Sequence, residues 1–235
     1  MDLNGKIILI TGGSLGIGLA SAKMLKEKGA TVIINGRNKE RLEAAGAEFG
    51  IETVQGDVSL EADVKKIYQL ISDKFGRLDA LINNAGYGYF STLDDIDLEK
   101  FNRVFATNVT GAMLMAREAV KFFKEQQSGN IINISSTAGT RGFAYGTAYS
   151  ATKFALRAMT ECWRAELRQH NIRVILINPS EVQTDFIENS GREKREFNKT
   201  KLQAVDIAHT ICGALEMEDR GFITELTVFA TNPQN

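Results

Sequence analysis

The sequence predicts a single α/β domain, a doubly wound sheet of about seven parallel strands with helices on both faces. Short apolar runs alternate with segments that carry hydrophobic residues at helical spacing, as in sheets whose strands are joined through helices. The apolar runs are nearly continuous, which is typical of strands that are covered on both faces. No proline- or serine-rich linker, repeat or low-complexity run divides the chain, so we expect one domain over residues 1–235.

The composition is that of an ordinary water-soluble globular protein, with 43% hydrophobic and 24% charged residues. The net charge of -1 gives no reason to expect nucleic acid or an anionic membrane as a partner. The apolar run at residues 7–10 is too short for a signal peptide or a membrane span, so we expect a cytoplasmic protein. Cys162 and Cys212 fit no metal spacing, and each is expected to be a small buried apolar residue.

The N-terminal segment combines a strand, a glycine-rich turn and a helix. Residues 6–11 form the predicted strand, TGGSLGIG follows, and the helical pattern ends at Gly29. Glycines allow close approach to a ligand, and a helix N-terminus presents unpaired N–H groups and a positive dipole end. We therefore expect a bound pyrophosphate, the alternative being a tight structural turn. The expected contacts are Gly12, Ser14, Leu15, Gly16, Ile17 and Gly18.

The second predicted strand, residues 31–35, ends without an acidic residue. In a dinucleotide-binding fold, an acid at this strand end binds the ribose 2′-hydroxyl, whereas an arginine accommodates a 2′-phosphate. Gly36 holds the acidic position, Arg37 and Asn38 follow it, and Arg41 lies one helical turn on. NADP(H) is therefore favoured over NAD(H), the alternative being that Arg37 is only a solvated residue.

Residues 52–55 and 78–83 are the third and fourth predicted strands. Ser59 is the expected N-cap of the helix between them. The fourth strand leads into NNAG at residues 83–86, and small or amide residues at a strand's carboxyl edge suit close approach of a cofactor. The same tetrapeptide could equally form a tight turn.

A long helical stretch is predicted over residues 97–126, with Asn108 inside it in the sequence ATNVTGA. Asparagine is a poor choice within a helix, because its side chain competes for backbone hydrogen-bonding groups. Asn108 is therefore either a tolerated surface residue or the mark of a local distortion with a use. On this sequence signal alone, both interpretations stay open.

Three candidate catalytic residues follow the long helix. The fifth predicted strand, residues 130–135, delivers Ser136 at its carboxyl end. Tyr149 and Lys153 are four residues apart on the first turns of a helix that runs to about residue 170, so they share one face. A lysine ammonium beside a phenol can make tyrosine an acid or base near neutral pH.

The C-terminal part completes the pattern. Residues 172–178 form the sixth predicted strand, followed by PSEVQT at residues 179–184. Residues 185–201 are polar and charged, and we expect a mobile cover over the substrate or a solvated helix. A helix at about 204–217 and a strand at about 222–229 end the chain. In the helix that bears Tyr149, Trp163 lies on a different face from Tyr149 and Lys153, so we expect it to pack in the core or against another subunit.

Together these motifs resemble the short-chain dehydrogenase/reductase family over essentially the whole chain. TGGSLGIG matches Thr-Gly-x-x-x-Gly-x-Gly, and Asp57-Val58, NNAG, the serine of INISS and YSATK fall in the family's order. The interval between Ser136 and Tyr149 is also the usual one. The resemblance implies a Rossmann-like fold and an oxidoreductase that transfers a hydride between NADP(H) and a carbonyl or secondary alcohol.

The resemblance also implies a role for individual residues. Tyr149 would be the general acid in carbonyl reduction, and Lys153 would hold the nicotinamide ribose and lower the tyrosine's pKa. Ser136 would bind the substrate oxygen, and Asn108 would anchor a water of a proton relay. The remaining implied cofactor contacts are Asp57 and Val58 at the adenine, Asn84, Ala85 and Gly86 along the cleft, and Pro179, Ser180, Val182 and Thr184 at the nicotinamide.

Three positions depart from the family's pattern. Leu15 stands where many NADP-preferring relatives have a basic residue, which weakens the preference for NADP, and Ser180 replaces a glycine. Gln127 and His170 occupy places where carrier-protein reductases tend to have basic residues. The expected substrate is a small carbonyl or alcohol, and a 3-oxoacyl-[acyl-carrier-protein] thioester is the alternative. The alternative from another class is a non-catalytic NADP(H)-binding redox sensor.

Two further expectations concern partners. Relatives commonly assemble through the helices that bear Asn108 and Tyr149, so the resemblance implies a homo-oligomer, a tetramer or a dimer. A basic cluster near the C-terminal third could meet an acidic partner or form a plain solvated face. Its members are Arg192, Lys194, Arg195, Lys199 and Lys201.

Overall fold

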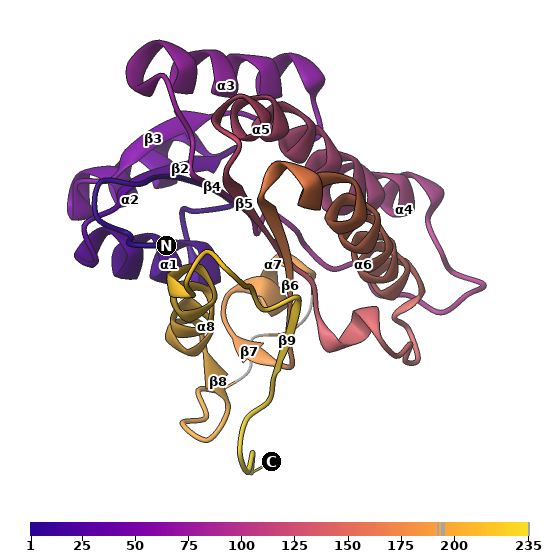
Figure 1. The fold of residues 1–235 in the computed structure, drawn as a ribbon. Coiled ribbons are helices and arrows are strands. Elements are labelled where there is room, and N and C mark those ends of the chain that lie inside the picture. Colours follow the sequence, from indigo (N-terminus) through magenta and orange to yellow (C-terminus); the bar gives the residue numbers. More distant parts are fainter. Residues whose placement is uncertain (192, 194–195, 235) are drawn as a thin grey trace.

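The computed structural model describes residues 1–191, 193 and 196–234, and its main element is a parallel sheet of seven strands (Figure 1). The strands lie in the order β3-β2-β1-β4-β5-β6-β9. Their bounds are β1 (Ile7–Thr11), β2 (Thr31–Gly36), β3 (Glu52–Gln55), β4 (Ala80–Asn83), β5 (Gly129–Ile134), β6 (Ile172–Pro179) and β9 (Glu225–Val228). The order reverses direction between β1 and β4, and ligands of such sheets bind beyond the carboxyl ends of the strands at this point.

Helices cover both faces of the sheet, as the sequence predicts (Figure 1). The α-helices are α1 (Gly16–Glu27), α2 (Lys39–Phe49), α3 (Glu61–Phe75), α4 (Leu98–Phe105), α5 (Ala112–Gln126), α6 (Thr147–Leu167), α7 (Phe186–Asn189) and α8 (Ala204–Glu216). A π-helix, η1 (Ala106–Gly111), joins α4 to α5, and 3-10 turns occur at η2 (Thr137–Gly139) and η3 (Arg168–His170). A doubly wound α/β fold is therefore confirmed.

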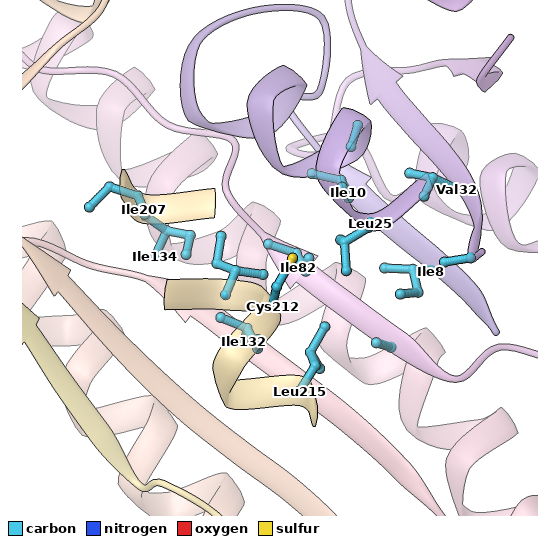
Figure 2. Close-up of a cluster of buried hydrophobic side chains, with 14 of the residues drawn as sticks. Ile8, Ile10, Leu25, Val32, Ile82, Ile132, Ile134, Ile207, Cys212 and Leu215 are labelled. Atoms are coloured by element: carbon cyan, nitrogen blue, oxygen red, sulfur yellow. The ribbon is translucent and has the colours of Figure 1, made fainter. Parts of the chain in front are cut away.

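Alternate residues of the strands point to opposite faces and form two cores. On one face, Ile8 and Ile10 of β1 pack with α1 and with α8, where Cys212 is buried (Figure 2). On the other face, Ile7 and Leu9 pack under α3 and α5. Burial on both faces explains why the strands read as continuous apolar runs rather than as an alternating pattern.

Three details differ from the sequence expectations. Leu60, not Ser59, is the N-cap of α3, because the Ser59 hydroxyl donates a hydrogen bond to Asp57 Oδ1 at 2.7 Å instead. Residues 97–126 are not one helix but α4, η1 and α5. Cys162 is exposed, contrary to expectation, since it lies two residues beyond buried Thr160 on the opposite side of α6.

The segment after β6 forms a second, small sheet. β7 (Val182–Gln183) pairs with β8 (Leu202–Gln203), an arrangement with no signal in the sequence. Of the predicted basic cluster, Arg192, Lys194 and Arg195 lie outside the described residues, whereas the Lys201 Nζ lies 3.4 Å from Glu181 Oε2. Within the described part of the chain, none of the helices has the length and apolar character needed to cross a membrane.

Candidate active site

A cavity of about 1350 Å³ lies beyond the carboxyl ends of the strands. It brings together segments that follow β1, β2, β3, β4, β5 and β6. Of the predicted catalytic and cofactor-binding residues, all of which the structure describes, only Gly18 and Asn108 do not line it. The lining predicted residues are Gly12, Ser14, Leu15, Gly16, Ile17, Arg37, Asn38, Asp57, Val58, Asn84, Ala85, Gly86, Ser136, Tyr149, Lys153, Pro179, Ser180, Val182 and Thr184.

The glycine turn between β1 and α1 is shaped for close approach. Gly12 and Gly16 have φ angles of +63° and +55°, a backbone region that favours glycine. Gly18 packs beneath the turn, where an added Cβ would lie 2.4 Å from the Gly12 carbonyl oxygen. The N-cap of α1, Leu15, offers no side-chain hydrogen bond, and the first turn has no acidic residue. The N–H groups at this helix end therefore suit an anion such as a pyrophosphate.

The loops after β1 and β4 are fastened to each other by Thr11 and Asn84. The Asn84 and Ala85 N–H groups both donate to Thr11 Oγ1 at 3.0 Å. In return, the Asn84 side-chain amide donates to the carbonyl oxygens of Thr11 and Gly12, at 2.9 and 3.1 Å. Sequence reasoning placed Asn84 at the cofactor but missed Thr11, which fixes the floor of the glycine turn.

Arg37 lies where β2 ends, on the wall of the cavity. Its side chain is 59% exposed, and its Nη1 lies 3.7 Å from Asp57 Oδ2 at the end of β3. Asn38 is the N-cap of α2, accepting a hydrogen bond from the Arg41 N–H at 2.8 Å. An exposed ion pair at this distance contributes little stability, so the guanidinium can turn to a phosphate at low cost.

Of the two interpretations of Asn108, a surface residue or a local distortion, the structure supports the distortion, because Asn108 is buried within the π-helix η1. Its side-chain amide donates to the Tyr87 carbonyl oxygen at 2.9 Å and to Thr152 Oγ1 at 3.1 Å, while Oδ1 accepts from the Tyr87 N–H. π-bulges occur frequently at functional sites. Asn108 thus links the loop after β4 to α6 from behind the cavity wall.

Tyr149 is 9% exposed and lines the cavity. Burial raises the pKa of its phenol to about 12, and a hydrogen bond with the Ser136 hydroxyl opposes part of that rise. The Ser136 Oγ also accepts a hydrogen bond from the Ala138 N–H at 3.1 Å, which fixes its position at the start of η2. The pair joins a strand end to the first turns of α6.

Lys153 is buried on α6 and donates a hydrogen bond from Nζ to the Ile134 carbonyl oxygen at 2.9 Å. Its Nζ lies 5.6 Å from the centre of the Tyr149 ring. Burial lowers the pKa of the ammonium to about 8. In this structure the ammonium is hydrogen-bonded to the backbone of β5, and that Lys153 lowers the Tyr149 pKa stays a prediction.

The buried Lys153 should give the protein a distinctive pH dependence of stability. Its pKa falls from 10.5 to about 8 on folding, so the unfolded chain binds more protons between these values. The free energy of unfolding should therefore rise with pH from about 8 to 10, by about 1 kcal/mol per pH unit. The measurement is urea unfolding of the wild type and Lys153→Met at pH 8.5 and 9.5. The free energy of unfolding of the wild type minus that of Lys153→Met should rise by about 1 kcal/mol between the two pH values, and a value that stays constant or falls would refute the prediction.

The segment after β6 covers the start of α1. The Ser180 N–H donates to the Val228 carbonyl oxygen at 2.9 Å, which holds the segment against β9 despite the replaced glycine. An added Cβ on Gly16 would lie 3.5 Å from the Thr184 side chain, so this segment closes over the glycine turn. The expected cofactor contacts in the glycine turn and in the segment after β6 therefore face one another.

Aromatic residues on two loops and on the helix α7 complete the cavity, and sequence reasoning did not identify them. Phe90 follows β4, Phe143 follows η2 and Phe186 begins α7. The Phe90 and Phe186 rings each lie 5.5 Å from the Tyr149 ring, between centres. The available signal was phenylalanine in otherwise small or polar loops, GYGYF and TRGFAYG.

A doubly wound sheet with this glycine turn and this serine, tyrosine and lysine at its carboxyl edge defines a dinucleotide-binding oxidoreductase. The family model for short chain dehydrogenase matches residues 6–195, and the chain belongs to that family. An oxidoreductase of Staphylococcus aureus (strain MRSA252) is 32% identical over 229 residues, covering 96% of this chain and 97% of that protein.

Two solved structures show the same fold over nearly the whole chain. The 3-ketoacyl-(acyl-carrier-protein) reductase from Brucella melitensis, complexed with NADH, has a TM-score of 0.90 and 30% identity, covering 97% of this chain and 98% of that one. The alcohol dehydrogenase from the archaeon Thermococcus sibiricus, complexed with 5-hydroxy-NADP, has a TM-score of 0.88 and 26% identity, covering 99% and 100%.

Proposed function

We propose that this protein is an NADP(H)-dependent carbonyl reductase or alcohol dehydrogenase acting on a small molecule. The observation that carries the proposal is the hydrogen-bonded pair of Ser136 and Tyr149, which faces the same cavity as Lys153 and the glycine turn. A proton donor and a hydrogen-bond donor at one point, beside a cradle for a dinucleotide, suit the reduction of a carbonyl.

The chain's residues would divide the work as follows. NADPH, when bound, supplies the hydride that reduces the carbonyl carbon. The Ser136 hydroxyl hydrogen-bonds the carbonyl oxygen, and Tyr149 passes its phenolic proton to that oxygen as the alkoxide develops. A phenol pKa of about 12 keeps Tyr149 protonated at neutral pH, as an acid in the reductive direction must be. The alkoxide is a stronger base than the phenolate, so this proton transfer is downhill.

Lys153 and Asn108 would help to bind the cofactor and to return a proton to Tyr149. The Lys153 ammonium, held on the Ile134 carbonyl oxygen, would bind the nicotinamide ribose. An added Cβ at Gly86 would lie 3.0 Å from Asn108 Oδ1 and 3.8 Å from Lys153 Nζ, so both side chains lie close to this glycine. We propose that Asn108 anchors a water through which Lys153 and Tyr149 recover a proton.

Arg37 should set the choice of cofactor. Arg37→Ala should weaken NADPH binding by about 10- to 100-fold, since a hydrogen bond to a charged group contributes about 1.5–3 kcal/mol. NADH binding should change by less than about threefold, because NADH has no 2′-phosphate. Titrations that follow the fluorescence of each reduced cofactor measure both affinities.

Lys39→Ala is the control for this charge change. Lys39 begins α2 two residues from Arg37, its side chain is 65% exposed, and it does not line the cavity. We expect it to leave both affinities close to the wild type. An equal loss of NADPH and NADH binding in Arg37→Ala would mean that Arg37 does not select the cofactor, and NAD(H) would then be the better candidate.

A 3-oxoacyl-[acyl-carrier-protein] thioester is the second candidate substrate. The likeness to the Brucella reductase favours it. Gln127 and His170 lie side by side, 3.5 Å apart, where carrier-protein reductases tend to have basic residues, and this disfavours it. A panel of ketones, aldehydes, sugars and a 3-oxoacyl thioester with NADPH decides between them: thioester turnover well above that of ketones would favour the carrier-protein reductase.

We also propose a homo-oligomer in the cytoplasm. Leu98 on α4 is 70% exposed and Phe154 on α6 is 43% exposed, and both helices belong to the expected interface. Sedimentation velocity should give the mass of a dimer or a tetramer. A non-catalytic redox sensor would need no proton donor, so reduction of any ketone that depends on Tyr149 would exclude it.

A further inference from the structure

Phenylalanine rings from three separate segments form part of the cavity wall. The ring centres of Phe90 and Phe186 each lie 5.5 Å from the ring centre of Tyr149. The ring centre of Phe143 lies 6.1 Å from that of Phe90. Phe143 is 47% exposed at the cavity, so the wall is open to an incoming molecule there. Two of the three rings, those of Phe90 and Phe186, thus lie next to the proposed proton donor.

Two glycines leave room for the rings of Phe90 and Phe143. An added Cβ at Gly88 would lie 2.4 Å from the Phe90 ring, and one at Gly146 would lie 2.8 Å from the Phe143 ring. Both rings therefore occupy volume that any other residue at the glycine positions would take. The absence of side chains at Gly88 and Gly146 thus leaves room for the Phe90 and Phe143 rings at the cavity.

Two hydrogen bonds also tie the three segments together. The Gly88 N–H donates to Ser190 Oγ at 3.0 Å, joining the Phe90 loop to the end of α7. The Ser91 N–H donates to the Tyr145 carbonyl oxygen at 3.0 Å, joining it to the Phe143 loop. Tyr145 adopts a φ of +67°, uncommon for a residue other than glycine, and so keeps this connection at some cost. The wall is thus one connected structure.

Because the Phe90 and Phe186 rings lie beside Tyr149, a carbonyl that reaches Tyr149 and Ser136 has apolar ring surface next to it for its substituent. Aromatic pairs are favourable with ring centres 4.5–7 Å apart, the range already found within the wall. A hydroxylated substituent would leave water for a surface of ring carbons and lose hydrogen bonds there. A short alkyl group would leave much of the ring surface without contact.

We propose that this site selects ketones in which the carbonyl carries an apolar ring, above all an aryl ring, over small linear or polyhydroxylated carbonyls. This inference rests on the proposed reductase function and names its substrate class. The Phe90, Phe143 and Phe186 wall receives the ring, while Ser136 and Tyr149 receive the carbonyl oxygen.

The test compares kcat/KM with NADPH for phenylacetone, 2-butanone and dihydroxyacetone. Phenylacetone places its ring one carbon from the carbonyl, so conjugation does not alter the carbonyl's reactivity. We expect kcat/KM for phenylacetone to exceed that for 2-butanone by at least 30-fold, and dihydroxyacetone to be the poorest of the three. The wild-type comparison alone can overturn the inference.

Variants then locate the selectivity. Phe90→Ala and Phe186→Ala should each lower the ratio of kcat/KM for phenylacetone over 2-butanone by at least tenfold. Phe90→Leu and Phe186→Leu serve where the alanine variants fail to fold, with a severalfold fall in the same ratio. Phe197→Ala removes a ring that is 72% exposed and does not line the cavity, so the ratio should stay at the wild-type value.

The outcomes separate the two claims. If no ketone is reduced by the wild-type protein, the proposed function fails. If ketones are reduced but phenylacetone has no advantage, or dihydroxyacetone is preferred, the ring inference is overturned and the reductase stands. An advantage that persists in all the phenylalanine variants of the wall would also overturn it.

Discussion

Tyr149→Phe should lower kcat for ketone reduction by about 10²- to 10⁴-fold while changing the affinity for NADPH by less than threefold. Only the phenolic hydroxyl is removed, and general acid catalysis by a positioned group contributes about 10²–10⁴-fold. The ring contacts with Phe90 and Phe186 remain, so the cavity keeps its shape. Steady-state kinetics with a saturating ketone, together with NADPH fluorescence titration, measure the two quantities.

Tyr68→Phe is the matched control, since it removes a second buried hydroxyl far from the cavity lining. Tyr68 on α3 is 4% exposed, and its hydroxyl donates to the Met115 carbonyl oxygen at 2.6 Å. Its loss should lower the free energy of unfolding by about 1 kcal/mol and leave kcat unchanged. Near-wild-type turnover in Tyr149→Phe would remove Tyr149 as the proton donor.

The second large effect is expected at Gly18, where one methyl group should weaken NADPH binding by about 10- to 100-fold. A Cβ there would lie 2.4 Å from the Gly12 carbonyl oxygen and 2.6 Å from Asn84 Nδ2. The first atom belongs to the glycine turn and the second to the side chain that is hydrogen-bonded to it, so the turn must move away from the helix end. Such overpacking costs about 1–3 kcal/mol. Because the glycine turn is the proposed pyrophosphate site, its displacement should weaken NADPH binding. Isothermal titration of Gly18→Ala with NADPH measures it.

Gly213→Ala separates this effect from the general consequence of replacing a helical glycine. Gly213 lies within α8, and an added Cβ there would have no neighbour within 4 Å. Alanine is the better helix former by about 1 kcal/mol, so stability should hold or rise and NADPH affinity should not change. If Gly18→Ala also bound NADPH normally, the glycine turn would not be the pyrophosphate site.

The fold could be predicted from the sequence because each strand and helix leaves a local signal. The run at β1 and the helical spacing in α3 depend on neighbouring residues alone. The cap of α3 was mispredicted because Ser59 has a competing partner in Asp57. The exposure of Cys162 follows from the rotation of α6 on the sheet, which composition does not reveal.

The site was predictable where it consists of motifs and not where it depends on tertiary contacts. The glycine turn, Arg37, Ser136 and Tyr149 all line one cavity, because parallel strands bring their carboxyl ends to one edge. The phenylalanine wall arises from two loops and α7, which come together only in the folded chain. The raised pKa of Tyr149 likewise results from burial, which no spacing in the sequence records.

The most direct test of the central claim follows the hydride and the proton donor together. The wild-type protein is incubated with phenylacetone and NADPH carrying deuterium at both C4 positions, and the product alcohol is examined by mass spectrometry. The account predicts one deuterium on the carbon that bears the new hydroxyl, formed by the wild type and not by Tyr149→Phe. An alcohol without deuterium, or equal formation by both proteins, would contradict it.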